Sequence, residues 1–93
     1  ELSNFTHDFT INYTRYDNSF KITKVQKEMS LIFEIYNGET DNLIYKTYLE
    51  LGKGVNYFIS TSYNINENFY NFRVKSYENE KLIHDEKIHL KLK

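Results

Sequence analysis

The chain has 93 residues with 12 basic and 13 acidic side chains, and its net charge of −1 gives it no electrostatic preference for nucleic acid or another polyion. It has no Cys, which excludes disulfides, thiolate metal sites and a nucleophilic thiol. Its apolar runs, such as Leu31-Ile32-Phe33, are too short to span a bilayer, and its first residues show no signal-peptide pattern. We therefore expect one soluble domain, residues 1–93, that depends on hydrophobic burial for its stability.

Alternation of apolar and polar residues predicts three strands in the N-terminal part of the chain. In residues 5–14 the apolar side chains share one parity, which is typical of a half-buried strand. Asp17-Asn18 supplies turn chemistry before a short strand at residues 20–25. A third strand alternates from Met29 and ends at Asn37-Gly38, where both residues tolerate a positive φ. Residues 39–42 are expected to form a loop.

Four more strands are predicted in the remainder. Residues 43–51 and 55–61 are joined by Gly52-Lys53-Gly54, a connection suited to a hairpin. The next strand carries Tyr70, Phe72 and Val74 on one face, and the turn Glu78-Asn79-Glu80 follows it. The last strand alternates apolar residues with lysines, which suits the edge of a sheet.

About seven short strands without a helix predict an all-β fold, an antiparallel two-sheet sandwich. A five-stranded closed barrel is the competing architecture, and it would suit an oligonucleotide-binding protein.

The segment Ile65-x-x-Asn68-x-Tyr70-x-Phe72-x-Val74 resembles a pattern of immunoglobulin-like and fibronectin type III-like sandwich modules. It also resembles the triple-tyrosine modules of bacterial surface and sensor proteins, and the resemblance covers roughly residues 43–92. It implies that Tyr70 is a tyrosine corner, with a buried ring and a hydroxyl bound to the main chain of residues 65–69. Asn68 stands where such turns use Gly, so a positive φ is expected at or beside it.

The histidines do not predict a metal site. They are His7, His84 and His89, and the last two flank an acidic pair in the segment HDEKIH. A spacing of five places His84 and His89 on opposite faces of a strand. His84 and Glu86 share a face, but two ligands do not make a site.

No pattern of residues predicts catalysis or a cofactor. The acidic residues are nine Glu together with Asp8, Asp17, Asp41 and Asp85, and no spacing joins any two of them into a catalytic pair. The sequence lacks a Gly-x-Ser-x-Gly elbow, and its three glycines form neither a dinucleotide fingerprint nor a phosphate loop. We expect no enzymatic activity, no catalytic or metal-binding residue and no cofactor.

The run FYNFRVKSY places Arg73 and Lys75 between aromatic residues, as on a strand that stacks bases. The interpretation that we favour is a core face of Tyr70, Phe72 and Val74 with solvated Arg73 and Lys75, and no nucleic-acid partner.

Two N-glycosylation sequons begin at Asn4 and Asn12, and alternation predicts that they are surface-exposed. About as many would arise by chance in so Asn-rich a chain, so they are not evidence of secretion.

The chain has nine Tyr and seven Phe, more aromatic residues than its core can hold. Alternation indicates that six tyrosines cannot all be buried: Tyr36, Tyr45, Tyr48, Tyr57, Tyr63 and Tyr77. Exposed tyrosines bind sugars by stacking or anchor protein interfaces.

These features predict a non-catalytic β-sandwich module of a larger secreted or cell-surface protein. It would act as a spacer, an adhesion domain or an accessory domain that binds protein or carbohydrate, beside flanking domains and without inserting into the membrane. The alternative is the oligonucleotide-binding β-barrel.

Overall fold

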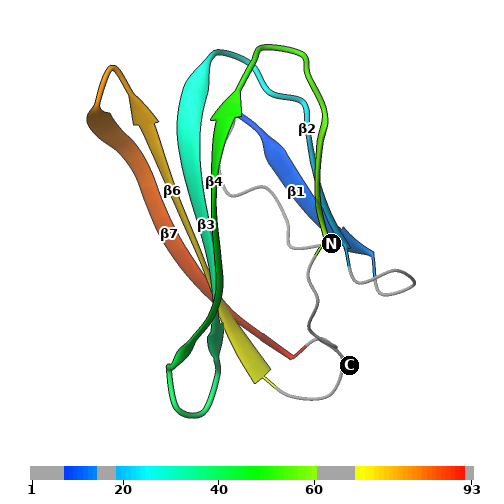
Figure 1. The fold of residues 1–93 in the computed structure, drawn as a ribbon, viewed down its shortest axis with the longest axis vertical. Coiled ribbons are helices and arrows are strands. Elements are labelled where there is room, and N and C mark those ends of the chain that lie inside the picture. The colour runs from blue at the N-terminus through cyan, green and yellow to red at the C-terminus, as the bar shows by residue number, and fades with distance from the viewer. Residues whose placement is uncertain (1–7, 15–18, 61–68, 92–93) are drawn as a thin grey trace.

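The computed structural model describes residues 8–14, 19–60 and 69–91, and these form an all-β fold (Figure 1). Seven strands lie in these ranges: β1 (Thr10–Thr14), β2 (Ser19–Thr23), β3 (Met29–Asn37), β4 (Leu43–Leu51), β5 (Tyr57–Ser60), β6 (Phe69–Glu78) and β7 (Lys81–Lys91). None of these segments is a helix long and apolar enough to cross a membrane.

The strands form two separate antiparallel sheets. One sheet has the order β1-β2-β5 and the other the order β4-β3-β6-β7. The predicted sandwich is therefore confirmed, whereas the closed barrel is wrong because no hydrogen-bonded ladder joins the two described sheets. Among the described strands, β7 pairs only with β6, so it lies at the edge of its sheet, as its lysines predicted.

The predicted hairpin at Gly52-Lys53-Gly54 is wrong, because β4 and β5 belong to different sheets. In Figure 1 the chain leaves the tip of β4 and crosses the end of the sandwich to reach the other sheet. The Val55 amide donates to the Gly52 carbonyl (3.2 Å), and the Gly54 amide donates to the Val25 carbonyl (2.9 Å). The first bond lies within the crossing, and the second joins the crossing to the β2–β3 connection. Strand β5 begins only at Tyr57.

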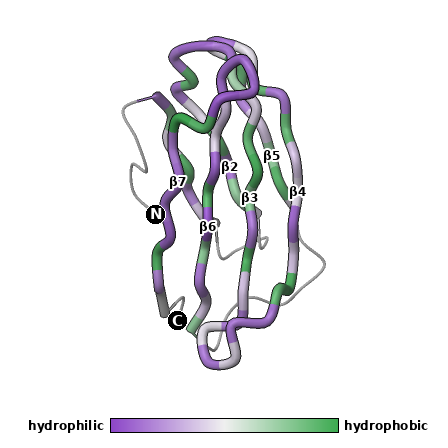
Figure 2. The backbone as a smooth tube through the Cα atoms, turned by 90° about the vertical axis from the view of Figure 1, so that its left-hand side faces the viewer, coloured by the Kyte–Doolittle hydropathy of each residue, from purple (hydrophilic) through white to green (hydrophobic). Residues whose placement is uncertain are grey.

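The core lies between the sheets and is built from the alternating inward residues of each strand. Figure 2 shows this alternation as changes of hydropathy along β3 and β6. Phe20 is fully buried at the centre. Its ring centroid lies 4.9 Å from that of Tyr13, 4.9 Å from that of Phe33 and 5.7 Å from that of Phe72. The other buried apolar residues are Phe9, Ile11, Ile22, Val25, Met29, Leu31, Ile35, Leu51, Ile59, Tyr70 and Val74.

Most strand bounds follow the prediction, and a positive φ explains the early end of the second strand. The second strand ends at Thr23 rather than residue 25 because Lys24 has a φ of 57°. After β3 the positive φ falls on Asp41 (60°), and Gly38 instead packs against the main chain of Phe69. The Asn37 side-chain oxygen accepts bonds from the Glu39 and Thr40 amides, which shapes the predicted loop at residues 39–42.

The predicted turn at Glu78-Asn79-Glu80 is confirmed, and it takes the form of a hairpin with two residues between β6 and β7. Asn79 and Glu80 have φ values of 52° and 65°. Positive φ at both central residues is the requirement of a type I′ turn, whose twist matches that of the flanking strands.

Tyr70 is buried, as the resemblance implied, and its ring centroid lies 6.4 Å from that of Phe72. Asn68 and the rest of the preceding turn lie outside the described residues. The hydrogen bond from the Tyr70 hydroxyl to that turn and the positive φ at Asn68 therefore stay predictions.

Candidate functional site

The outer face of the four-stranded sheet carries ion pairs between neighbouring strands. Arg73 on β6 donates from Nε and Nη2 to the two oxygens of Asp85 on β7, each over 2.9 Å. Hydrogen bonding to Arg73 lowers the pKa of Asp85 below its ordinary value, and the same bond raises the pKa of Arg73. The sequence had suggested that Arg73 is simply solvated, but the side chain forms an ion pair with Asp85.

A buried carboxylate lies beside this pair. Glu34 is 4% exposed although it points to the outer side of β3. Its oxygens lie 3.6 Å from Lys75 Nζ and 3.9 Å from Lys46 Nζ, so long cationic side chains cover it. Partial burial, and secondly a hydrogen bond to Glu34, raise the pKa of Tyr36. The charged side chains in the middle of this face are therefore paired with one another.

A second group of contacts lies nearer the β3–β4 loop. Asp41 accepts a hydrogen bond from the side-chain Nδ2 of Asn71 (3.0 Å) and lies 3.3 Å from Lys87 Nζ. The hydrogen bond from Asn71, and to a smaller extent that from Lys87, lowers the pKa of Asp41. The Lys87 ammonium also lies 5.3 Å from the centre of the Tyr36 ring. This end of the face is paired in the same way as its middle.

The histidines occupy opposite faces of β7, as their spacing predicted. His84 lies opposite Ser76 on the inner side, and His89 lies opposite Asn71 on the outer side. His84 Nε2 lies 2.7 Å from a carboxylate oxygen of Asp8, a contact between residues 76 apart that no sequence pattern indicated. Across the described ranges, no three His, Asp or Glu side chains converge as metal ligands. His7 and Asp17 lie outside those ranges.

The six tyrosines that alternation singled out have different environments. Tyr45 and Tyr57 pack against the core, and Tyr36 and Tyr77 are half-buried. Tyr48 is 57% exposed, and Tyr63 lies outside the described residues. As expected, these tyrosines are not all buried.

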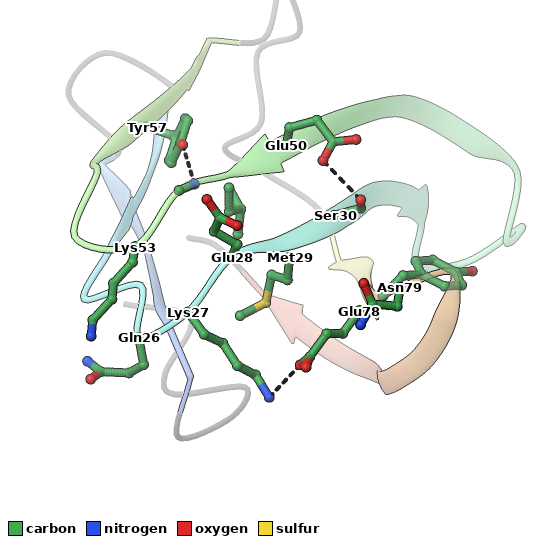
Figure 3. A pocket seen from close by; sticks show the side chains of 13 residues that line it. Gln26, Lys27, Glu28, Met29, Ser30, Glu50, Lys53, Tyr57, Glu78 and Asn79 are labelled. Atoms are coloured by element: carbon green, nitrogen blue, oxygen red, sulfur yellow. Dashed lines mark hydrogen bonds and ion pairs between the residues drawn. The ribbon is translucent and has the colours of Figure 1, made fainter.

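A hollow of about 960 Å³ opens at the end of the sandwich where the β2–β3, β4–β5 and β6–β7 connections meet (Figure 3). Met29 and Leu51 are its buried apolar residues, and Tyr77 and Tyr57 also line it. The Tyr57 hydroxyl accepts a bond from the Gly52 amide (2.7 Å). Sequence reasoning missed this hollow because three connections distant in the sequence create it.

Three polar side chains are joined at the rim of this hollow. The Ser30 hydroxyl donates to one oxygen of Glu50 over 3.1 Å, as Figure 3 shows. The Tyr48 hydroxyl donates to the other oxygen of Glu50 and lies 3.2 Å from the Ser30 hydroxyl. The exposed ring of Tyr48 is thereby fixed beside the hollow.

The sequon at Asn12 lies on β1, opposite Lys21 of β2. Asn12 is half-buried rather than fully exposed, and its side-chain oxygen is buried without a hydrogen-bond partner in the described structure. The sequon at Asn4 lies outside the described residues.

No protein-family model and no curated protein matches the chain. Among solved structures it is similar to part of a family 76 glycoside hydrolase from a bovine Bacteroides thetaiotaomicron strain, with 14% identity over 87% of this chain and 19% of that chain and a TM-score of 0.49. It is also similar to part of a glycosyl hydrolase family 2 member from Bacteroides cellulosilyticus, with 10% identity over 95% of this chain and 15% of that chain and a TM-score of 0.49. The chain thus spans less than a fifth of either enzyme, and a likeness of this degree transfers no function.

Proposed function

We propose that this chain is a non-catalytic, fibronectin type III-like module of a larger secreted or cell-surface protein, and that it acts as a connector and accessory binding domain. The strand orders β1-β2-β5 in one sheet and β4-β3-β6-β7 in the other support a fibronectin type III-like sandwich. Binding, to carbohydrate or to protein, takes place at the hollow and the exposed Tyr48 beside it.

The non-catalytic role is supported mainly by the hydrogen bonds and ion pairs that the carboxylates form with neighbouring side chains. A general acid at neutral pH needs a carboxyl group whose pKa is raised towards 7. The pKa values of Asp41 and Asp85 are lowered instead, because hydrogen-bond donors hold both groups as anions. Glu34 lies between two lysines. These arrangements favour a structural role for the acidic residues.

The same pairing favours a neutral partner over nucleic acid. Arg73 and Lys75, the cations interleaved with aromatic residues in the sequence, each contact a carboxylate on the sheet face. Binding a phosphate there would require breaking these contacts, and phosphate binding depends on available cations.

Incubation of the purified chain with a panel of neutral oligosaccharides tests the proposal, with anomeric proton signals recorded over several hours. We expect no new reducing ends. Cleavage that Glu50→Gln abolishes would contradict the non-catalytic role. Surface labelling of the source cells tests the location, and a chain that is labelled only after lysis would contradict it.

A further inference from the structure

We infer that the rim of the hollow binds a neutral oligosaccharide, with one sugar ring stacked on Tyr48 and its hydroxyls bound to Glu50 and Ser30. This inference rests on the proposed function, because it names the ligand class of the same surface. Its first support is the fixed orientation of Tyr48. The ring is 57% exposed, yet its hydroxyl contacts both Glu50 and Ser30. A side chain that is already ordered loses little entropy when a ligand stacks on it.

The second support is the remaining hydrogen-bonding capacity of Glu50. Its two oxygens accept from Ser30 and from Tyr48 respectively. Each carboxylate oxygen has two lone pairs, so each can accept one further bond. Adjacent hydroxyls of a sugar that stacks on Tyr48 would donate to both oxygens.

The third support is the continuation of the surface into the hollow. Tyr77 lies directly opposite Ser30 across the β3–β6 pair and lines the hollow. Met29 lies in the same hollow, and the exposed Asn79 and Lys53 lie at its border as hydrogen-bond donors. The surface thus offers aromatic and apolar area together with donors and acceptors, which suits a ligand longer than one sugar.

The charges of the lining favour an uncharged ligand. Lys27 forms an ion pair with Glu78 over 2.8 Å, visible in Figure 3. The other charged residues in the lining are two acidic ones, Glu28 and Glu50, and one basic one, Lys53. An anionic ligand would meet these carboxylates, and a cationic ligand would compete with the lysines, whereas a neutral polyol meets neither cost.

Met29 is the only methionine of the chain, so a ¹³C-methyl label gives a single reporter inside the hollow. We would titrate the labelled chain with neutral glucan, xylan, mannan and galactan oligosaccharides, with an acidic glycan, and with a Tyr-rich peptide. The variant is Tyr48→Ala. The control is Phe58→Ala, which removes a 65% exposed aromatic ring from the other sheet.

We expect a saturable shift of the Met29 methyl signal with at least one neutral oligosaccharide, an affinity lowered about tenfold or more by Tyr48→Ala, and no change with Phe58→Ala. Three results would overturn the inference: no shift with any neutral oligosaccharide, equal weakening by both variants, or saturation only with the acidic glycan or the peptide. New anomeric signals in the same tubes would instead overturn the proposed non-catalytic function, so the two failures are distinguishable.

Discussion

Arg73 on β6 and Asp85 on β7 form a two-point ion pair across the outer face of the four-stranded sheet, with both N–O distances 2.9 Å. Because the pKa of Asp85 is lowered in the folded chain, the pair stabilises the fold fully above the ordinary pKa range of a carboxyl group. This stability is lost as the pH falls through the lowered pKa.

We therefore expect Asp85→Asn to lower the melting temperature at pH 7 by a few degrees, and this difference to shrink in acid. Thermal melts at about pH 7 and about pH 2 would measure it, since an ordinary aspartate is protonated at the lower pH. Glu86→Gln, at an exposed position on the same strand, is the control and should change the melting temperature less. An Asp85→Asn difference that is constant over this pH range would contradict the account.

Gly38 is needed because it approaches the main chain at the start of β6. Its amide donates to the Phe69 carbonyl over 2.8 Å, and an added Cβ would lie 2.5 Å from that carbonyl. We expect Gly38→Ala to lower the free energy of unfolding by about 1–3 kcal/mol through this collision. Gly54 has a φ of 75° and open space around it, so Gly54→Ala should cost only about 1 kcal/mol of backbone strain. Denaturant titrations that rank Gly54→Ala as the more harmful change would contradict the collision.

The β6–β7 hairpin contains a residue that strains its turn. Glu80 has a φ of 65°, which a side chain with a Cβ adopts at a cost, whereas Asn79 before it tolerates such a φ. We expect Glu80→Gly to raise the free energy of unfolding by about 0.5–1 kcal/mol and Glu80→Val to lower it. A stabilising effect of valine in the same denaturant series would be incompatible with this turn.

Ser76 places a hydroxyl inside the apolar core. It is 0% exposed, and its oxygen has no hydrogen-bond partner among the described residues. We expect Ser76→Ala to be neutral or to stabilise the fold by up to about 1 kcal/mol, because it removes an unsatisfied polar group. Ser30→Ala removes a hydroxyl that binds Glu50 and should lower stability by about 0.5 kcal/mol. A loss larger than this for Ser76→Ala, measured by calorimetry, would indicate that the buried hydroxyl is satisfied.

The strands were predictable because period-two alternation is a local signal. Tyr70, Phe72 and Val74 pack inward on β6, and residues 43–51 form the strand that their alternation predicted. The partner of each strand was harder to predict. Gly52-Lys53-Gly54 has the chemistry of a hairpin, yet the chain changes sheet there, and the Gly54 amide donates to the Val25 carbonyl of the β2–β3 connection.

The candidate site was less predictable than the strands. The surplus of tyrosines was visible, but alternation could not tell the exposed Tyr48 from Tyr45 and Tyr57, which pack against the core from strands at the sheet edges. The alternation in β3 also gave no sign that Glu34, on the outer face, would be buried by Lys46 and Lys75. Both outcomes depend on neighbours that are distant in the sequence.

The salt dependence of oligosaccharide affinity tests the central claim most directly, namely that binding uses the tyrosine rim and not the charged sheet face. The dissociation constant for the tightest neutral oligosaccharide would be measured by calorimetry in about 50 mM and about 500 mM sodium chloride. Stacking and hydrogen bonds to an uncharged ligand survive such salt, so the account predicts dissociation constants that agree within about twofold. A loss of about tenfold or more at high salt would assign binding to the charged face and contradict the account.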